Sequence, residues 1–470
     1  MKIAMIASEA VPFAKTGGLA DVAGALPLAL EDCAHEVIII MPRYKCVTAA
    51  KFPTRRVSKD ISSSVAGKKI KVYFIEHDLY FNRDGLYGDK NGDYKDNLER
   101  FAFFCRRALD LLKEINFAAD IIHLHDWQSS LVAVYLKNLY AGQPFYNRMK
   151  TILTIHNLGY QGILPKDDFA KLVLDWGLFD ISGLEFYNQV NLLKGGIIFS
   201  DFINTVSPTY ALEIRGKEFG FGLDGLLNQR KDALSGILNG IDYSIWDPGT
   251  DKFIKRNFSR AAIKDKAYNK AELQKICGLP VDNAIPVLGI VSRLAEPKGF
   301  DLIADGLTQI TKMGAQLVIL GTGNLKYHQL LTAGALKYPK VISLNLRFDD
   351  PLAHKIYAGS DIFLMPSSYE PCGLGQMISL RYGTIPLVFK TGGLADTINK
   401  DNGFIFPKHT KDDLLKCIKQ CLAAFKDKGK WSALMNNAME CDFSWGASAK
   451  KYSQLYVKAK ENQNCNRRYR

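Results

Sequence analysis

The feature that most constrains this chain is a repeated alternation of short apolar segments with segments of helical periodicity. In the first third, apolar segments lie at 2–7, 37–41, 70–75, 121–124 and 151–155, and apolar residues recur at helical spacing at 19–30 and 98–112. Buried strands that alternate with helices are typical of a parallel sheet covered on both faces. We therefore predict an α/β fold.

The alternation stops near residue 240 and then starts again. Gly236, Gly240 and Pro248 interrupt it, as glycine and proline commonly do between elements. Later strands are predicted at 287–291, 317–320, 341–344, 361–365 and 385–389, with a helix at 300–313. We predict two Rossmann-like domains, residues 1–240 and 241–443, and a segment, 444–470, whose helix packs back on the first domain. Ligands of open parallel sheets bind at the carboxyl ends of the strands, so two domains with facing strand ends would form a deep cleft.

Charge and cysteine usage exclude several functions. The chain has 470 residues and a formal net charge of +13, but its basic residues are dispersed, apart from a basic tail at 466–470. This distribution favours a small phosphorylated ligand over nucleic acid. The nine cysteines include no Cys-x-x-Cys pair, which predicts reduced thiols, no metal site and a cytoplasmic protein. No apolar run is long enough for a membrane span, and Glu9 interrupts an apolar start that is too short for a signal peptide.

The heptapeptide Lys-Thr-Gly-Gly-Leu-Ala-Asp occurs at 15–21 and again at 390–396. The first copy follows a predicted strand and opens a predicted helix. Its Gly17 and Gly18 would let the backbone approach a ligand, the helix N-terminus favours an anion, and Lys15 adds a charge suited to phosphate. A plain Gly-Gly turn is the alternative, and these residues alone do not decide between the two.

Two polar turns directly follow predicted strands: His-Leu-His-Asp-Trp at 123–127 and His-Asn-Leu-Gly-Tyr-Gln-Gly at 156–162. Hydrogen-bonding and aromatic groups together suit a sugar, which offers hydroxyls and apolar ring faces. We predict functional roles for Asp126 and His156 and a structural, hydrogen-bonded role for His123. No third ligand completes a metal site here.

Arg293 and Lys298 lie in a turn that follows the predicted strand at 287–291. Two cations there suit a diphosphate whose negative charge grows as it leaves, and a basic surface turn is the alternative. Glu370 also follows a predicted strand, and backbone N–H groups beyond it could hold sugar hydroxyls or phosphate. Cys372 has no adjacent activating histidine, so we predict a packing role rather than a nucleophile.

Together these motifs resemble those of bacterial glycogen synthases and the closely similar plant starch synthases, along essentially the whole chain. The matching stretches are KTGGLADVAGALP at 15–27, HLHDW at 123–127, TIHNLGYQG at 154–162, INTVSPTYALEI at 203–214, LNGID at 238–242, SRLAEPKG at 292–299, EPCGL at 370–374, RYGTIPLVFKTGGLADT at 381–397 and DFSW at 442–445. Several ordered motifs are far more specific than any one of them.

The resemblance implies a GT-B fold, with two Rossmann-like domains whose parallel sheets face each other across a deep cleft. It implies retaining glucosyl transfer from ADP-glucose to the non-reducing end of an α-1,4-glucan such as glycogen, with no cofactor and no metal. We predict no nucleic-acid or membrane partner, and the oligomeric state stays open. By the resemblance, the catalytic residues are Glu370, His156, Arg293, Lys298 and Asp126; the donor-binding residues are Lys15, Gly17, Gly18, Asp21, Asn239, Phe348, Cys372, Gly373, Leu374 and Gly375; and Tyr87 and Asn157 line the sugar side.

Three positions depart from the pattern of the resembling families. Phe348 stands where a tyrosine usually stacks on adenine, so a ring face is kept and a hydroxyl is lost. Gly375 stands where threonine is common. Ile378 stands where related families have a second carboxylate, so a covalent glucosyl intermediate lacks an obvious nucleophile. We therefore favour front-face attack, in which the leaving oxygen of ADP helps to deprotonate the acceptor hydroxyl.

Other functions stay open for this architecture. A glycan phosphorylase would need a pyridoxal cofactor, which absorbance would reveal. A non-catalytic glucan-binding protein would have no need of Lys15, Arg293, Lys298 and Glu370 together. A nucleotide-dependent oxidoreductase would need a Gly-x-Gly-x-x-Gly turn after the first strand, and the sequence has none there. For the second heptapeptide we predict shared turn geometry only, with Lys390 as a solvated cation.

Overall fold

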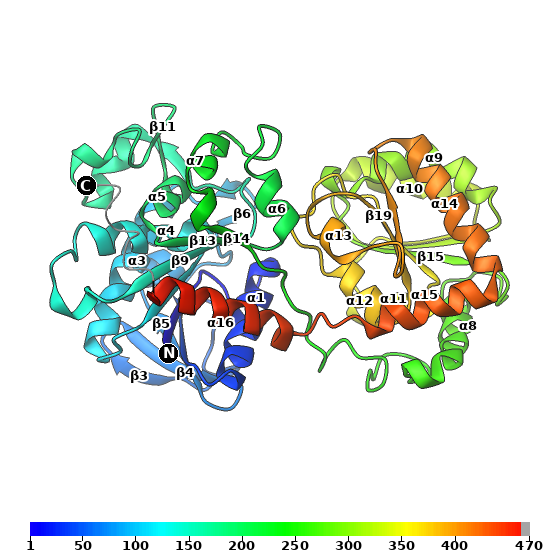
Figure 1. Cartoon of the computed structure of the whole chain (residues 1–470), viewed down its shortest axis with the longest axis horizontal. Coiled ribbons are helices and arrows are strands. Elements are labelled where there is room, and N and C mark those ends of the chain that lie inside the picture. The colour runs from blue at the N-terminus through cyan, green and yellow to red at the C-terminus, as the bar shows by residue number, and fades with distance from the viewer. Residues whose placement is uncertain (462–470) are drawn as a thin grey trace. The chain divides into compact units, whose positions relative to one another are not determined.

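The computed structural model describes residues 1–461, which divide into two compact units (Figure 1). The N-terminal unit contains residues 1–240 together with the segment that begins at Trp445, and the C-terminal unit contains residues 241–444. The predicted basic tail at 466–470 lies outside the described residues. No helix of the described part is both long enough and apolar enough to cross a membrane.

The N-terminal unit is built on a nine-stranded sheet with the order β14-β13-β9-β8-β1-β2-β5-β4-β3. The strands are β1 (Lys2–Ile6), β2 (Glu36–Pro42), β3 (Arg55–Ser58), β4 (Ile61–Ala66), β5 (Ile70–Ile75), β8 (Ile121–His125), β9 (Lys150–Ile155), β13 (Phe202–Thr205) and β14 (Leu234–Gly236). All neighbouring strands pair in parallel except β3 with β4 and β4 with β5. The sequence pattern predicted the parallel part, and the antiparallel edge was missed because β3 and β4 are largely polar.

Helices cover both faces of this sheet. They are α1 (Gly18–Asp32), α2 (Asp78–Phe81), α3 (Asn97–Glu114), α4 (Asp126–Lys137), α5 (Leu192–Phe199), α6 (Pro208–Glu213), α7 (Asp224–Gln229) and α16 (Trp445–Glu461). The step from β1 to β2 and the step from β8 to β9 run in opposite directions along the sheet. Right-handed crossovers therefore place α1 and α4 on opposite faces, and β1 between them is almost entirely buried.

The N-terminal unit also contains two small sheets of short strands. The pair β6 (Gly88–Asp89) and β7 (Gly92–Asp93) forms a small hairpin, and β10 (Ile163–Pro165), β11 (Glu185–Phe186) and β12 (Gln189–Asn191) form a three-stranded antiparallel sheet. Helix α16 follows the C-terminal unit in sequence but packs against α1 and β9. Its Tyr452 and Tyr456 are fully buried.

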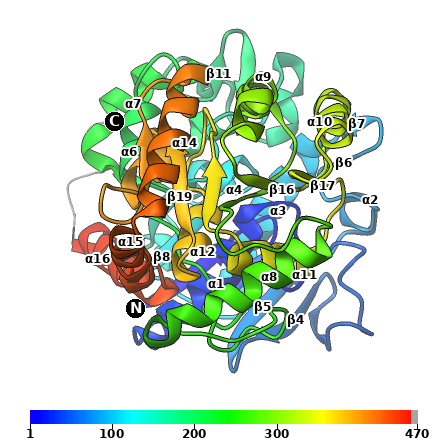
Figure 2. The same cartoon turned by 90° about the vertical axis from the view of Figure 1, so that its right-hand side faces the viewer.

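The C-terminal unit is built on a six-stranded parallel sheet with the order β17-β16-β15-β18-β19-β20 (Figure 2). The strands are β15 (Val287–Val291), β16 (Gln316–Leu320), β17 (Ile342–Asn345), β18 (Ile362–Met365), β19 (Ile385–Phe389) and β20 (Phe404–Phe406). The helices are α8 (Lys266–Ile276), α9 (Phe300–Thr311), α10 (Leu325–Lys337), α11 (Asp350–Gly359), α12 (Gly375–Arg381), α13 (Gly392–Thr397), α14 (Lys411–Lys426) and α15 (Lys428–Glu440).

Both sheets have a Rossmann-type order. In the C-terminal unit the first strand in sequence, β15, lies next to the fourth, β18, and this is the 3-2-1-4-5-6 order of doubly wound sheets. In the N-terminal unit β1 lies next to β8 in the same way. Ligands of such sheets bind where the order reverses, at the carboxyl ends of the two central strands. The fold thus confirms two α/β units and directs attention to the loops after β1, β8, β15 and β18.

Candidate active site

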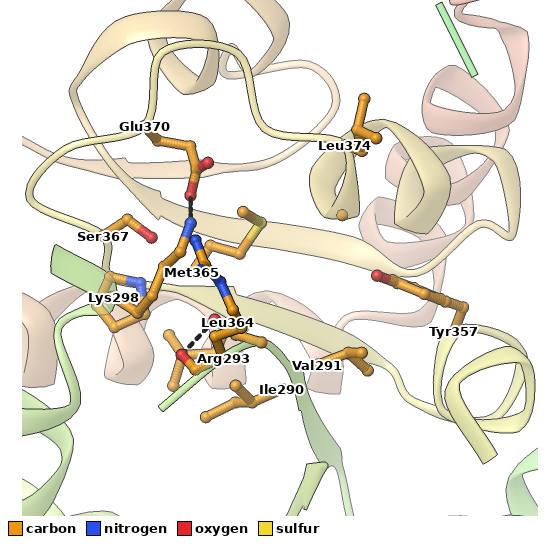
Figure 3. A pocket seen from close by; sticks show the side chains of 13 residues that line it. Ile290, Val291, Arg293, Lys298, Tyr357, Leu364, Met365, Ser367, Glu370 and Leu374 are labelled. Carbon is orange, nitrogen blue, oxygen red and sulfur yellow. Dashed lines mark hydrogen bonds and ion pairs between the residues drawn. The ribbon is translucent and has the colours of Figure 1, made fainter. Parts of the chain in front are cut away.

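A pocket in the C-terminal unit opens at the carboxyl ends of β15 and β18 (Figure 3). It is lined by Ile290, Val291, Ser292, Arg293, Lys298, Tyr357, Leu364, Met365, Pro366, Ser367, Glu370, Leu374 and Gly375. Five residues predicted for the site therefore lie together: Arg293, Lys298, Glu370, Leu374 and Gly375. This is the place that the strand order indicates for a ligand.

Lys298 and Glu370 form an ion pair across the pocket, with Lys298 Nζ 2.6 Å from Glu370 Oε2. Lys298 ends a 3₁₀ turn, Glu296–Lys298, and Glu370 lies in the loop after β18. Arg293 is exposed and has no ion-pair partner within the described residues. The pocket thus combines one paired cation, one cation that no anion of residues 1–461 pairs with, and one carboxylate. Its charge suits an anionic ligand such as a diphosphate.

The loop that carries Glu370 rests on the second copy of the repeated heptapeptide. The Gly393 N–H donates to the Glu370 carbonyl at 3.1 Å. A Cβ at Gly393 would lie 2.0 Å from the Cys372 carbonyl oxygen, and one at Gly392, whose φ is +41°, would lie 2.0 Å from the Glu370 carbonyl oxygen. These glycines are therefore required by the close approach of two backbone segments. Lys390 is exposed, as predicted.

The other residues predicted to bind the donor from the C-terminal unit differ in how exposed they are. Cys372 is buried, and Gly373 has a φ of +71°, which favours glycine. Phe348 is 89% exposed and does not line the pocket. It precedes α11 at the surface, so its predicted stacking on a nucleotide base stays a prediction.

In the N-terminal unit the first heptapeptide has open surroundings. Lys15 Nζ pairs with Asp21 Oδ1 at 2.7 Å, and both side chains are partly exposed. A Cβ at Gly17 or Gly18 would meet no atom within 4 Å. Packing therefore does not require a glycine at either position. In the second copy, by contrast, packing requires glycine at both Gly392 and Gly393. The space next to both glycines of the first copy is therefore open within this unit.

The carboxylate of Glu9, for which the sequence predicts no role, binds this loop. Glu9, 3% exposed, accepts hydrogen bonds from the backbone N–H of Thr16 and from Thr16 Oγ1, the latter at 3.0 Å. Burial raises the pKa of Glu9, and the bonds from Thr16 oppose that effect. The available signal was an acidic residue just beyond the first buried strand, which is an unusual place for an unpaired charge.

Asp126 fixes the turn that contains His156. Its Oδ1 accepts the His156 backbone N–H at 2.7 Å. The backbone φ of Asp126 is +54°, a conformation that costs about 1 kcal/mol for a residue with a side chain. Burial raises the pKa of Asp126 to about 7, although the backbone N–H groups of His156 and Asn157 lower it. Strain and a perturbed carboxyl group in one residue are typical of functional sites.

Two buried histidines, His123 and His125, lie next to this turn, and His156 in the turn is half-buried. His123 is bonded on both sides, from Nε2 to Thr154 Oγ1 at 2.7 Å and from Nδ1 to the Tyr456 hydroxyl at 2.8 Å, which confirms its structural role. His125 Nδ1 lies 2.9 Å from His156 Nε2. Burial lowers the pKa of His156 to about 3, so the ring is neutral.

The tautomer of His156 follows from its neighbour. His125 Nε2 is buried and has no hydrogen-bond partner among the described residues. A buried N–H without a partner is rarer than a buried acceptor without one, so we assign the His125 proton to Nδ1, which donates to His156 Nε2. His156 then carries its own proton on Nδ1 and offers an N–H donor. His125 was not among the predicted site residues.

The remaining predicted residues also lie in the N-terminal unit. The Tyr87 hydroxyl is 2.7 Å from Ser8 Oγ, just after β1. Asn157 Oδ1 accepts the Gly159 N–H at 2.9 Å and so shapes its own turn. Asn239 is 7% exposed, and within residues 1–461 its Oδ1 has no hydrogen-bond partner. No group of three or more His, Cys, Asp or Glu side chains suited to a metal occurs in the described part of the chain.

Comparisons with known proteins cover both units. A family model described as the starch synthase catalytic domain matches residues 2–229, and one described as glycosyl transferases group 1 matches residues 285–424. A glycogen synthase of Geotalea uraniireducens is 49% identical, with 97% of this chain and 98% of that protein covered. A glycogen synthase of Thermotoga maritima is 44% identical, with 98% and 99% covered.

Solved structures show the same relationship. The catalytic domain of starch synthase IV from Arabidopsis thaliana, solved with ADP and acarbose, matches with a TM-score of 0.88 and 35% identity, covering 97% of this chain and 99% of that one. A sucrose-phosphate synthase from Thermosynechococcus elongatus, at 18% identity and a TM-score of 0.63, shows likeness of fold alone. These matches confirm the predicted GT-B fold class.

Proposed function

The chain belongs to the glycogen and starch synthase family of glycosyltransferases, and from this premise we propose that it transfers glucose from ADP-glucose to the non-reducing end of an α-1,4-glucan such as glycogen. The reaction releases ADP and retains the configuration at the anomeric carbon. The observation that carries the proposal is the C-terminal pocket, in which Arg293, Lys298 and Glu370 meet at the switch point of a Rossmann-type sheet.

We assign the diphosphate of the donor to Arg293 and Lys298. Negative charge accumulates on ADP as the bond to glucose breaks, and fixed cations stabilise that charge without reorganising. The ion pair with Glu370 holds Lys298 in place. Glu370 is also assigned to the hydroxyls of the donor glucose, because a carboxylate accepts hydrogen bonds from sugar hydroxyls.

We assign the sugar and acceptor side to the N-terminal unit. The Nδ1–H of His156 is the donor proposed for a glucose oxygen, and Asp126 fixes the turn that presents it. The loop with Lys15, Gly17 and Gly18 is assigned to the donor, and its support is the open space in front of both glycines. Tyr87, Asn157 and Asn239 keep their predicted contact roles.

The proposed chemistry is front-face attack. The acceptor hydroxyl forms the new bond to the anomeric carbon on the face from which ADP leaves, the bond from that carbon to the ADP oxygen breaks, and the hydroxyl proton passes to the departing phosphate. The support is Ile378, a buried apolar residue of α12 at the position where a second carboxylate would act as a nucleophile. A glucosyl group trapped on any side chain would contradict this scheme.

We propose that the reaction needs no metal and no other cofactor, because Arg293 and Lys298 can supply the charge that a divalent cation supplies elsewhere. Transfer that is unchanged after treatment with a chelator is the expected result. Loss of transfer that Mg²⁺ restores would contradict it. An absorbance band of bound pyridoxal in the purified protein would instead favour a phosphorylase.

The decisive experiment measures transfer of labelled glucose to glycogen from ADP-glucose, UDP-glucose and GDP-glucose in parallel. We expect labelled α-1,4-linked glucose with ADP-glucose as the best donor. The three donors share a diphosphate, so the preference among them tests the nucleotide part of the proposal separately. If none of them supports incorporation, the proposed activity is wrong.

A further inference from the structure

Tyr357 of α11 lines the C-terminal pocket from a rigid position. The residue is 4% exposed, and its ring packs on that of Phe363 with 4.9 Å between the ring centroids and on Trp246 at 5.4 Å. Its backbone carbonyl accepts from Lys266 Nζ at 3.3 Å and from Thr384 Oγ1 at 2.5 Å. Figure 3 shows Tyr357 across the pocket from Lys298, with its hydroxyl directed into the space between them.

The Tyr357 hydroxyl has no hydrogen-bond partner among the described residues, although a buried tyrosine hydroxyl usually finds one. Burial raises the pKa of Tyr357, so the hydroxyl keeps its proton and acts as a donor. A rigid donor at the wall of a pocket, with no acceptor within residues 1–461, points to an acceptor on the ligand.

Gly375 keeps the approach to this hydroxyl open. A Cβ at Gly375 would lie 3.3 Å from the Tyr357 hydroxyl oxygen and 2.9 Å from Cε1 of the buried Phe363 ring. A side chain there would displace the ring and fill the space in front of the hydroxyl. The φ of Gly375 is not in the left-handed region, so space rather than backbone conformation explains the glycine.

We propose that the Tyr357 hydroxyl donates a hydrogen bond to a phosphate oxygen of the nucleotide sugar, and that Gly375 provides the room for that oxygen. The inference rests on the proposed function, because it takes ADP and ADP-glucose as the ligands. A phosphate oxygen is favoured over a sugar hydroxyl because Arg293 and Lys298 line the same pocket and attract anions. A hydroxyl donor also bonds more strongly to a charged acceptor than to a neutral one.

The test is Tyr357→Phe in the full chain, with ADP and adenosine binding measured by calorimetry. We expect about 10- to 100-fold weaker ADP binding, the usual effect of losing one hydrogen bond to a charged group, and unchanged adenosine binding. Without ligand, the melting temperature should stay level or rise, because the substitution removes a buried hydroxyl that has no partner in the described part of the chain. Tyr268→Phe is the matched control, since Tyr268 is 59% exposed on α8 and does not line the pocket.

Three results would overturn the inference. ADP binding equal to that of the wild type would show that the hydroxyl is not used. Equal losses for adenosine and ADP would place it at the nucleoside. A lower melting temperature without ligand, with the ADP-induced rise preserved, would show a packing role. If the wild type itself binds ADP but transfers no glucose, the proposed activity fails while the phosphate contact stands.

Discussion

At the scale of single residues, Arg293 and Lys298, the two cations that line the pocket, give the most specific prediction about catalysis. Arg293→Ala and Lys298→Ala should each lower kcat by about 10²- to 10³-fold, the usual effect of removing one fixed donor to developing charge. The measurement is the initial rate of glucose transfer from ADP-glucose to glycogen. Lys390→Ala is the matched control, because Lys390 is an exposed cation of the same unit that does not line the pocket.

The outcome for Arg293 is the more diagnostic of the two. Lys298 is paired with Glu370, so its removal also leaves a carboxylate without its partner. Arg293 has no such pairing within residues 1–461, and its removal subtracts only its own charge. A loss of less than about threefold for Arg293→Ala would mean that this side chain does not contact the departing diphosphate.

The raised pKa of Asp126 predicts how the rate of glucose transfer depends on pH. Its pKa is raised to about 7 by burial, so the carboxylate that accepts the His156 N–H is present only above that pH. We expect kcat/KM to fall as the pH drops below about 7, by up to tenfold per unit. Asp126→Asn keeps an acceptor that does not titrate, so the variant should be less active but should lack this acidic limb. The same limb in both proteins would assign it to another group.

The stability of the folded state should change with pH in the opposite sense. The folded protein holds the Asp126 proton more tightly than the unfolded chain does, because the pKa is raised in the fold. This contribution to stability is present at low pH and is lost as the pH rises through about 7. Asp126→Asn should remove that loss, which chemical denaturation at pH 5 and pH 8 can measure.

At the scale of elements, the two copies of the heptapeptide have the same letters and opposite environments. Both follow a strand and open a helix, α1 in one unit and α13 in the other. Gly18 faces open space, whereas Gly393 abuts the backbone of Cys372. In our proposal, the glycines of the first copy give a ligand access to the backbone. The glycines of the second copy allow the loop that carries Glu370 to pack closely against them.

Alanine substitution should separate these two roles. Gly393→Ala places a Cβ 2.0 Å from the Cys372 carbonyl oxygen, so it should cost about 1–3 kcal/mol of folding free energy and displace Glu370. Gly18→Ala meets no atom within 4 Å, so it should leave stability unchanged and lower only the use of the donor. Thermal melting and transfer rates measure both effects. Equal destabilisation by the two substitutions would contradict the difference in packing.

The elements also show what the sequence could and could not predict. The strands at 287–291 and 385–389 have the predicted bounds, because buried parallel strands are short, continuous apolar runs. The strand β4, with three consecutive serines, has no such signal and is defined by its pairing with β5. Pairing partners are distant in sequence, so local pattern cannot reveal them.

The site residues follow the same logic. Arg293, Lys298 and Glu370 were predicted because each follows a recognisable strand and carries chemistry suited to a ligand. Glu9, His125 and Tyr357 were missed because their roles come from contacts between distant segments: Glu9 with Thr16, His125 with His156, and Tyr357 with the space at Gly375. Burial and unpaired polar atoms, which identify such residues, are properties of the fold and not of the local sequence.

At the scale of the whole molecule, the path of the chain determines which parts can fold alone. The C-terminal unit is continuous in sequence, and its two ends pair, with the Ile241 N–H donating to the Phe443 carbonyl at 2.8 Å. The N-terminal unit is discontinuous, because it needs α16 from beyond residue 444. In that helix the Tyr456 hydroxyl bonds to His123 and the Tyr452 hydroxyl accepts from Asn204 Nδ2.

Fragments should therefore differ in stability. Residues 241–444 expressed alone should unfold cooperatively on heating. Residues 1–240 alone should not fold, because loss of α16 removes the hydroxyl partner of His123 Nδ1, at about 1–3 kcal/mol, and exposes the apolar surface that Tyr452 and Tyr456 cover. Asn204 Nδ2 loses its contact with the Tyr452 hydroxyl and keeps the one with Thr154 Oγ1. Those losses are a large part of a typical folding free energy of about 5–15 kcal/mol.

Reattaching α16 provides the control. A Cβ at Gly240 would lie 2.6 Å from the backbone nitrogen of Trp445, so a short glycine linker can join residues 1–240 to residues 445–461 without strain. The joined fragment should regain a cooperative thermal transition by circular dichroism, and Tyr456→Phe in it should lower the melting temperature, because the buried Nδ1 of His123 loses its partner. A transition in residues 1–240 as sharp and as high in temperature as that of the joined fragment would show that α16 is dispensable, and that the unit is defined by its sheet alone.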